Sequence, residues 1–446
     1  MDFAHSLLPA ALFVLAVLGH AFLWIGLTNR FDAVGAPRRV VKIMTGSCLL
    51  CLAGVPVAWL AWLIGQREHL LAAWHTISES HAVRAYLAIC CIVATVTLLR
   101  LAYLRLRRSP PIVRFHRRRR LPMERGLSRP TFGRCPSRRS GSYPSTVPDR
   151  RENGTVPLAA NSDHHRLARL PGNETLHLEL SEWILDVPGL ETALDGLSII
   201  HLSDLHFTGW IGKAYFHEVV DHCNQLQPDL VAITGDLVDT VACLDWTGEI
   251  LGRLAARYGV YFVLGNHDRR IDIQRLRGSL TERGLIDLGG RCMQVEVRGQ
   301  PVMLAGNERP WIGAAPGLDG KLDRDSPMFA DHSFAAVPGE LGHSPAGASI
   351  RPLRIALAHT PDQLRWARKQ SVDLLLAGHT HGGQIRLPPL GAIFSPCLSG
   401  VKHVSGLFYD PPTILHVARG VSGSVPFRWN CRPEVALLRL REGDRP

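Results

Sequence analysis

The stretch LLLAGHTHGGQIRL (Leu374–Leu387) joins an apolar run directly to two histidines set among glycines. Its first four residues, Leu374–Ala377, predict a short buried strand. His379 and His381 follow at the end of this strand, where an imidazole cannot pack as a hydrophobic side chain. The glycines around them allow a sharp backbone turn and leave room for a ligand. The question is whether other strands of the chain end in the same kind of residue.

From about residue 173 onward the sequence has the pattern of a compact α/β domain. Apolar segments of about four to six residues alternate with helical segments of about ten to fifteen, which indicates strands and helices joined by mostly short connections. The segment Gly313–Ser349, rich in Gly, Pro, Asp and His, lacks this periodicity and is interpreted as an inserted loop, with a lid as one possible role. The predicted strands are 197–203, 229–234, 260–264, 302–306, 353–358 and 373–378, and the predicted helices are 213–226, 244–258 and 271–284.

Five of these strands are followed by side chains of the type that bind metals. In open α/β sheets, binding sites lie at the carboxyl ends of the strands, so we expect these side chains to meet. In chain order, the motifs are SDLH (Asp204 and His206), GDLVD (Asp236 and Asp239), GNHD (Asn266, His267 and Asp268), a single His359, and GHTH (His379 and His381).

Each motif alone has a structural interpretation, such as an Asp that caps a helix or an Asn that fills a turn. Their joint occurrence in this order favours a metal site. Oxygen and imidazole ligands without thiolate suit Zn, Mn or Fe and do not decide among them. The ligands exceed what one ion needs. A pair of ions roughly 3.5–4 Å apart, bridged by a carboxylate and a water, would use nearly all of them in phosphoester hydrolysis by in-line attack.

The block order D-x-H, G-D-x-x-D, G-N-H-D, H and G-H-x-H resembles that of the calcineurin-like metallophosphoesterase superfamily and is complete between Asp204 and His381. Two further stretches, GHTHGGQIRLPPLGAIFSP and ARGVSGSVPFRWNCRPEVALLRL, look like the membrane-linked bacterial phosphodiesterase subgroup, and the resemblance extends over residues 197–440. It implies an α/β fold, a two-sheet β sandwich flanked by helices, with two divalent metal ions.

The resemblance also implies a role for each residue. Asp204, His206 and His381 would hold one ion. Asn266, His359 and His379 would hold a second ion, and Asp236 would bridge the two. The seven implied metal ligands are Asp204, His206, Asp236, Asn266, His359, His379 and His381.

His267 is implied as the catalytic group beside the leaving oxygen, either as proton donor or as charge stabiliser. Asp239 is implied as the residue that orients its ring. This assignment agrees with general chemistry, because a hydrogen-bonded carboxylate keeps an imidazole both aimed and protonated.

The N-terminal part contains three apolar runs, Leu7–Leu27, Ile43–Ile64 and Val83–Leu104. Each has about the length needed to cross a hydrocarbon core of roughly 30 Å. The first alone resembles a signal peptide, but it lacks a basic region and two runs follow it. We therefore expect a multi-pass transmembrane anchor of three helices over residues 1–105. Arginines and Lys42 in the first loop, and arginines after the third run, place the C-terminal domain on the cytoplasmic side of the inner membrane.

The formal net charge of +11 is concentrated in one segment. Residues 105–151 contain 15 arginines against two acidic residues, a balance of +13, so the rest of the chain carries −2. We expect residues 106–172 to be an Arg/Pro/Ser-rich cytoplasmic linker, mostly disordered, that contacts anionic headgroups. Nucleic-acid binding is disfavoured because aromatic residues do not alternate with the arginines. Residues 173–446 would form the catalytic domain. The ten cysteines show no paired spacing, which fits a reducing compartment.

The substrate is predicted to be a phosphodiester or pyrophosphate, lipid-linked as one interpretation. Lys213, Arg269 and Arg270 are candidates for binding a second phosphate, or are solvated surface charges. A phosphomonoesterase or a nuclease with an incidental anchor is the alternative, and a non-catalytic scaffold with the same fold is another. Aromatic and apolar residues near the first motif either grip an acyl chain or cover the core, namely Phe207, Trp210, Ile211 and Phe216.

Overall fold

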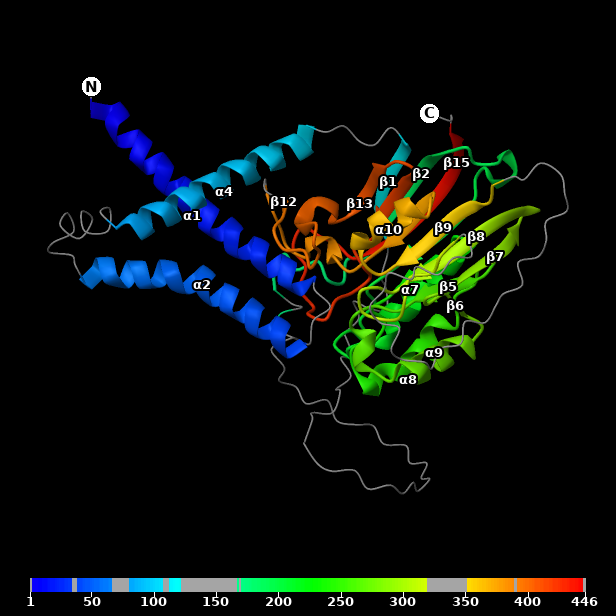
Figure 1. Ribbon diagram of the computed structural model, residues 1–446. Helices are drawn as coiled ribbons and strands as arrows, with labels where there is room; N and C mark the ends of the chain where they lie inside the picture. The colour runs from blue at the N-terminus through cyan, green and yellow to red at the C-terminus, as the bar shows by residue number, and fades with distance from the viewer. Residues whose placement is uncertain are drawn as a thin grey trace, which may run out of the picture. The chain divides into compact units, whose positions relative to one another are not determined.

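The structure is a computed structural model, and it describes residues 2–33, 38–65, 80–106, 112–121, 167, 170–318, 351–388 and 391–443. The chain divides into two compact units (Figure 1). The helical unit comprises Met1–Pro110 together with Arg386–Val404, and the catalytic-fold unit comprises Pro111–Ile385 together with Ser405–Pro446.

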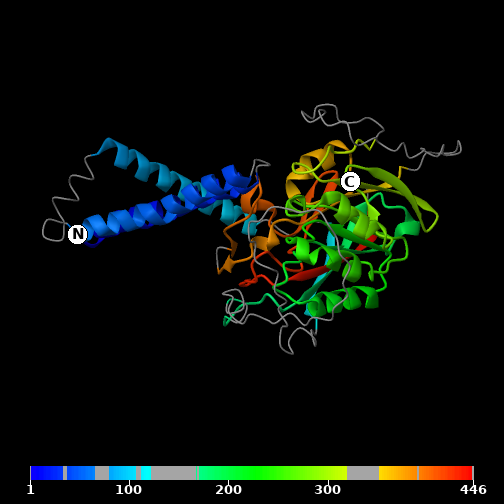
Figure 2. The same cartoon turned by 90° about the horizontal axis from the view of Figure 1, so that it is seen from below.

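The helical unit contains α1 (Asp2–Asp32), α2 (Arg38–Gly65) and α4 (His81–Leu106). All three helices are long and apolar enough to cross a membrane. α1 packs against both α2 and α4 (Figure 2). A polar contact lies inside this bundle, where Nδ1 of His20 is 2.6 Å from the hydroxyl of Tyr86.

The segment Arg386–Val404 belongs to the helical unit rather than to the unit that contains its chain neighbours. It holds the short strands β11 (Arg386–Leu387) and β12 (Gly391–Ala392). The side chain of Asn29 in α1 fixes it at two points: Nδ2 donates to the carbonyl of Ile393 over 3.2 Å, and Oδ1 accepts from the backbone N–H of Ser395 over 3.0 Å. The sequence pattern had placed this segment in the catalytic domain.

The first sheet of the catalytic-fold unit has seven strands among the described residues, in the order β1-β2-β15-β3-β4-β5-β6. β3 to β6 are parallel, so their carboxyl ends lie along one edge. β15 enters between β2 and β3, parallel to the former and antiparallel to the latter. The strands are β1 (Val113–Arg120), β2 (Glu179–Pro188), β3 (Ser198–Leu202), β4 (Leu230–Thr234), β5 (Val260–Val263), β6 (Ile286–Asp287) and β15 (Glu434–Gly443).

The second sheet, counted over the same described ranges, has six strands in the order β13-β14-β10-β9-β8-β7. Its four central strands are parallel, and an antiparallel strand lies at each edge. The strands are β7 (Cys292–Val297), β8 (Gln300–Asn307), β9 (Leu353–Ala358), β10 (Leu374–Ala377), β13 (Gly406–Asp410) and β14 (Thr413–Val417).

Three apolar clusters show how the layers pack. One lies between the sheets, where alternate residues such as Ile199 and Ile355 face each other. The second lies under α7, α8 and α9, and the third lies under α10 on the outer face of the second sheet (Figure 1). The fold is therefore the expected α/β sandwich of two sheets flanked by helices. The helices are α7 (Lys213–Gln225), α8 (Leu244–Trp246), α9 (Ile273–Thr281) and α10 (Leu364–Lys369).

One expectation about local structure was wrong, and the structure decides between two alternatives for another. The helix predicted over 244–258 is only α8 followed by one wide turn, Thr247–Leu251. Gly248 and Gly252 lie in this stretch, and glycine is a poor helix former. Of the two interpretations of the apolar residues after the first motif, the structure supports core packing for Phe207, Ile211 and Phe216, which are buried in the cluster under α7.

The structure also differs from the expected linker at residues 113–120. These residues form β1, an edge strand paired antiparallel with β2. Acidic residues on β2 face the arginines of β1; the Nε of Arg114, for example, lies 3.0 Å from Asp186. His116 stacks on Trp183 of β2, with ring centroids 3.4 Å apart. Part of the basic segment is therefore ordered against complementary charge, although most of the predicted linker lies outside the described residues.

Candidate metal centre

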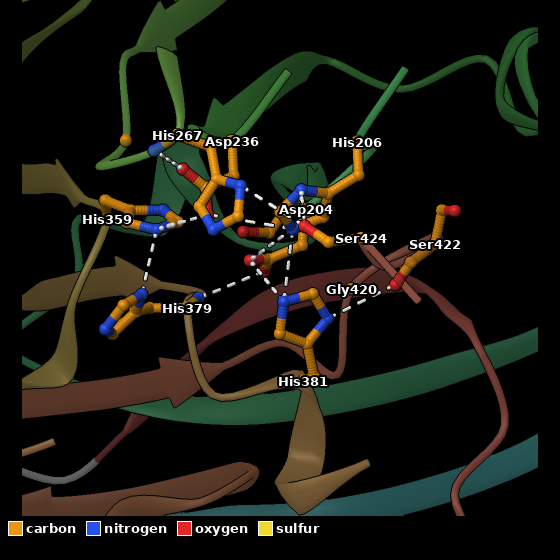
Figure 3. Close-up of polar contacts among 12 residues, drawn as sticks. Asp204, His206, Asp236, His267, His359, His379, His381, Gly420, Ser422 and Ser424 are labelled. Carbon is orange, nitrogen blue, oxygen red and sulfur yellow. Dashed lines mark hydrogen bonds and ion pairs between the residues drawn. The ribbon is translucent and has the colours of Figure 1, made fainter. Parts of the chain in front are cut away.

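The structure brings all seven predicted metal ligands together. Figure 3 labels them apart from Asn266. Asp204 and His206 follow β3, Asp236 follows β4, and Asn266 follows β5, each at the carboxyl edge of the first sheet. The second sheet contributes three histidines at the carboxyl ends of β9 and β10, namely His359, His379 and His381.

Asp204, His206 and His381 form a group that we call the first cluster. The Nε2 atoms of the two histidines are 3.1 Å apart. Oδ1 of Asp204 lies 3.4 Å from Nε2 of His381 and 3.8 Å from Nε2 of His206. The side chains of Asp204 and His206 are fully buried. The three groups therefore face one small shared space.

Asp236, His359 and His379 form the second cluster. Nε2 of His359 lies 3.1 Å from Nδ1 of His379 and 3.2 Å from Oδ2 of Asp236. Oδ1 of Asn266 is 3.0 Å from the same His359 nitrogen. Oδ2 of Asp236 is also 3.6 Å from Nε2 of His206 in the first cluster. Asp236 thus lies between the two clusters.

Hydrogen bonds fix which nitrogen of three histidines faces these spaces. Nδ1 of His359 lies 2.7 Å from the carbonyl of Thr234, and Nδ1 of His381 lies 3.2 Å from the carbonyl of Ser422. Nδ1 of His206 lies 3.1 Å from Oδ2 of Asp239. Each Nδ1–H therefore has an oxygen acceptor, which leaves a lone pair on Nε2. Metal-binding histidines in proteins commonly use this arrangement.

The backbone is unusual at the same positions. Asp204, His206, Asp236, His379 and His381 all have φ between 45° and 71°. Residues with a Cβ seldom adopt this left-handed region, and such outliers concentrate at functional sites. The neighbouring glycines are required sterically: a Cβ on Gly265 would lie 2.3 Å from Oδ1 of Asp236, and one on Gly378 would lie 2.6 Å from Oδ2 of Asp204.

The electrostatics keep the carboxylates ionised. Burial alone would raise the pKa of Asp204, but the neighbouring His381 outweighs burial and holds that pKa below its usual range. His359 and His267 do the same for the pKa of Asp236. In contrast, burial lowers the pKa of His379 to about 3, which keeps this imidazole neutral. At His359 the charge of Asp236 outweighs burial and raises the pKa to about 9, so a cation there would displace a proton from the ring. Ionised carboxylates and neutral imidazoles are the states that bind cations.

These groups fit divalent cations as ligands. Oδ1 of Asp204 is buried and accepts no hydrogen bond within the described structure. Pairs of imidazole nitrogens face each other at 3.1 Å in both clusters. A buried unpaired carboxylate oxygen and opposed lone pairs are unfavourable without a partner. A cation in each cluster would satisfy these atoms. Carboxylate oxygen together with imidazole nitrogen suits Zn, Mn or Fe, the metals that the sequence also indicated.

Asp239 contacts more groups than the sequence indicated. Its Oδ1 accepts a short hydrogen bond from Nδ1 of His267, as expected, and its Oδ2 faces Nδ1 of His206. The hydroxyl of Ser424 donates to the same Oδ2 over 2.7 Å. One carboxylate therefore orients a predicted ligand and the predicted catalytic histidine. The backbone N–H of His267 donates to Oδ1 of Asp236 over 2.8 Å, which ties the His267 turn to the second cluster.

Asp268, the last residue of GNHD, has a structural role. It is fully buried, and its carboxylate accepts from three backbone N–H groups: Leu237 at 2.9 Å, Val238 at 3.1 Å and Gly265 at 2.8 Å. It joins the loops after β4 and β5. The alternative interpretation of Asp268 as a helix cap was therefore wrong, because its carboxylate binds these loops and caps no helix.

Sequence reasoning missed two residues beside the centre. Ser424 contacts Asp239, and it lies 3.2 Å from Nδ1 of both His206 and His267. Its stretch GVSGSV carries no motif that marks one serine. Trp311 is half-buried, and its ring centroid lies 4.8 Å from that of His379 and 5.5 Å from that of His359. No strand pattern pointed to it.

The three basic candidates for phosphate binding differ in position. Lys213 forms a short ion pair with Glu249 and lies over the ring of Trp246. Arg269 is exposed. Arg270 lies beside the centre, with Nη1 2.9 Å from Nδ1 of His267.

Comparison with known proteins agrees with this geometry. The family model described as calcineurin-like phosphoesterase matches residues 197–383, which include every predicted site residue. Phosphodiesterase YaeI of Escherichia coli is 27% identical over 54% of this chain and 81% of its own length. Metallophosphoesterase YkoQ of Bacillus subtilis is 30% identical over 55% of this chain and 83% of its own length. A transmembrane protein with metallophosphoesterase domain from Danio rerio is 30% identical over 58% of this chain and 56% of its own length.

The fold, the clustered ligands and these matches lead to one conclusion. The chain belongs to the calcineurin-like phosphoesterase family and is a metal-dependent hydrolase of phosphoester bonds.

Proposed function

We propose that this chain is a two-metal phosphodiesterase or pyrophosphatase that acts at the cytoplasmic face of a membrane. The observation that carries the two-metal part is the position of Asp236. Its Oδ2 lies 3.2 Å from a histidine of the second cluster and 3.6 Å from a histidine of the first. A carboxylate in this position can be shared by two cations, and Mn, Zn and Fe all suit the donor set.

When bound, such a pair of divalent ions activates water and stabilises charge on the phosphoryl oxygens. In our proposal the first cluster holds one ion. His359 and His379, with Asn266, would hold the other, and Asp236 would be shared between the two. His267 protonates the leaving oxygen. The side chain of His267 is 18% exposed, so its ring can reach both a substrate and the buried Asp239.

Asp239 aims the His267 ring through Nδ1, and Nε2 lies on the side of the metal centre, 4.0 Å from Oδ2 of Asp236. A carboxylate partner also stabilises the imidazolium that donates the proton. Arg270 lies next to this ring and supplies a positive charge for a second phosphate group or for the charge of the leaving group. This placement favours a diester or pyrophosphate over a simple monoester.

We propose a lipid-linked substrate on the basis of exposed apolar residues around the centre. Val425, adjacent to Ser424, is 44% exposed, and Trp429 is 47% exposed. Ile385 is 36% exposed and pairs with Trp429 through a backbone bridge. Exposed apolar residues around a polar site are typical of a surface that contacts lipid. A relative named as a transmembrane protein agrees with a membrane setting.

In the same proposal the three apolar helices form a multi-pass anchor, with the catalytic domain in the cytoplasm and the basic linker on anionic headgroups. The predicted boundaries at 105 and 172 belong to this proposal, with β1 assigned to the catalytic domain. Because the arginines of β1 already face acids of β2, headgroup contact falls to the other arginines of the linker.

Substrate profiling of the purified full-length chain with Mn²⁺ tests the proposal. The panel contains a phosphodiester, a phosphomonoester, a single-stranded DNA and a lipid-linked pyrophosphate in mixed micelles. We expect the lipid pyrophosphate or the diester to be the best substrate. If only monoesters or only DNA turned over, the alternatives of a phosphomonoesterase or a nuclease with an incidental anchor would be correct. A complete lack of turnover with full metal loading would favour a non-catalytic scaffold.

A further inference from the structure

Arg428 is a fully buried arginine in the loop between β14 and β15. Its residue exposure is 1%, and it is among the largest fully buried side chains of the described chain. Within the described residues, its guanidinium donates to backbone carbonyls, places Nη2 3.3 Å from Nδ1 of His381, and forms none of the ion pairs. A buried charge without a carboxylate partner is costly. We therefore infer the role of Arg428 from the groups that its guanidinium contacts.

The guanidinium joins two segments that are far apart in the sequence. Nη1 donates to the carbonyl of Arg419 over 2.8 Å and to the carbonyl of His381 over 3.3 Å. Nη2 donates to the carbonyl of Gly420 over 3.4 Å and forms a short hydrogen bond to the carbonyl of Ser422. Arg428 thus ties the segment 419–424, which we call the site loop, to the turn that carries His381.

The carbonyl of Ser422 is the important acceptor. It accepts from Arg428, and it also lies 3.2 Å from Nδ1 of His381 (Figure 3). Arg428 therefore holds the oxygen that orients the His381 ring and leaves its Nε2 lone pair directed at Asp204 and His206. Partners of this kind, one bond removed from a metal, set the orientation of the ligand.

The site loop also contacts the other two members of the first cluster. The backbone N–H of Ser422 donates to the carbonyl of Asp204 over 2.9 Å. Gly420, with φ +77°, packs so closely that a Cβ there would lie 2.7 Å from Cβ of Asp204. Ser424 lies 3.2 Å from Nδ1 of His206. All three residues of the first cluster thus contact the loop that Arg428 holds.

The second cluster is supported by other parts of the chain. His359 is oriented by the carbonyl of Thr234 in β4, and Trp311 lies against both His359 and His379. Oδ1 of Asp236 accepts from the backbone N–H of His267. These supports come from β4 and from the loops after β5 and β8, and none of them is a residue of the site loop. The site loop approaches this side only through the hydroxyl of Ser424, which lies 3.2 Å from Nδ1 of His267.

We propose that Arg428 is a positioning residue that sets the affinity of the first cluster for its cation and leaves the second cluster unaffected. The proposal rests on the two-metal function above. Arg428, which touches neither substrate nor cation, thus controls only one of the two sites.

The test is a Mn²⁺ titration of the metal-stripped full-length chain in detergent, with free Mn²⁺ followed by electron paramagnetic resonance. Arg428→Met removes all donors, and Arg428→Lys keeps the charge. Each is combined with His359→Ala, which leaves only the first cluster intact, and with His381→Ala, which leaves only the second. Arg432→Met is the matched control, because Arg432 lies in the same segment but pairs with Glu174 and Glu179.

In the His359→Ala background, we expect Arg428→Met to weaken binding of the remaining ion about 10- to 100-fold. In the His381→Ala background we expect no change, and Arg432→Met should behave as the parent chain in both. Partial recovery with Arg428→Lys would support the role of the charge in holding the carbonyls.

Equal weakening in both backgrounds, no weakening in either, or loss of the cooperative unfolding transition in both Arg428 variants would overturn the proposal. These outcomes are distinct from failure of the two-metal function, which would appear as fewer than two ions bound by the unmodified chain.

Discussion

The Nε2 atoms of His206 and His381 lie 3.1 Å apart, although 175 positions separate the two residues in the chain. Each ring directs its Nδ1 at an oxygen, Asp239 in one case and Ser422 in the other. The two Nε2 atoms lie beside Oδ1 of Asp204, which is buried and accepts no hydrogen bond within the described residues. A cation bound by these three atoms would satisfy all of them. The residues that orient the two rings can be tested one by one by substitution.

Asp239 is expected to affect both metal binding and catalysis. Asp239→Asn removes the negative charge that orients His206 and His267, so we predict a decrease in kcat of about 10²- to 10⁴-fold, the range associated with loss of general acid–base catalysis. Steady-state kinetics at saturating Mn²⁺ provides the measurement. Asp245→Asn is the control, because the side chain of Asp245 is 84% exposed and, among the described residues, pairs with Arg275 at the surface. Similar kinetics for both variants would contradict the role of Asp239.

His267 is expected to act on the leaving group, and this has a specific kinetic signature. His267→Gln should reduce kcat about 10²-fold or more for a diester with an alkyl leaving group, which needs a proton. For a nitrophenyl diester, whose leaving group departs as a stable anion, the loss should be much smaller. An equal loss with both substrates would indicate charge stabilisation rather than proton donation.

A pair of histidines away from the metal centre is expected to make stability depend on pH. His416 of β14 and His201 of β3 are fully buried between the two sheets, with their Nδ1 atoms 2.8 Å apart. Burial lowers the pKa of His416 to about 4. Because the folded pKa lies below the unfolded value of about 6.5, its contribution is complete above pH 6.5 and is lost as the pH falls toward 4.

His416→Gln removes this titration. The unfolding free energy of the parent chain should fall between pH 7 and pH 5 by about 2 kcal/mol more than that of the variant. Urea denaturation of both proteins in the same detergent measures the difference. Identical pH dependence of the two proteins would show that folding does not lower the pKa of His416, which would contradict this prediction.

The proposed topology is tested by reporters fused to the C-terminus. The arginines that flank the apolar helices predict that the catalytic domain is cytoplasmic. Green fluorescent protein should then be fluorescent and alkaline phosphatase inactive when fused after Pro446. The opposite result would place the centre on the other side of the membrane and would exclude the basic linker from cytoplasmic headgroups.

Local patterns predicted the central part of the fold well. Continuous apolar runs marked β3, β4, β5, β9 and β10, and the polar residues at their ends marked the site, because parallel strands place their carboxyl ends at one edge. Pairings between distant segments were not readable in this way. β15 lies between β2 and β3 although about 250 residues separate it from β2, and no periodicity encodes such a neighbour.

Residues that act through tertiary contacts were also missed. Ser424 and Arg428 lie in an irregular loop where no spacing rule applies, and only the folded chain shows that the loop meets His206 and His381. The arginine-rich segment that forms β1 had the composition of a linker. They form a strand because β2 offers acidic residues and an open edge, which the composition of the segment itself cannot reveal.

The metal content of the purified full-length chain tests the central claim most directly. After purification with Mn²⁺ and dialysis, inductively coupled plasma mass spectrometry should find about two ions per chain. Asp236→Ala, which removes the carboxylate between the clusters, should lose both the bound ions and the activity. A parent chain that binds no divalent ion, or an Asp236→Ala variant that keeps both ions and full turnover, would contradict the account.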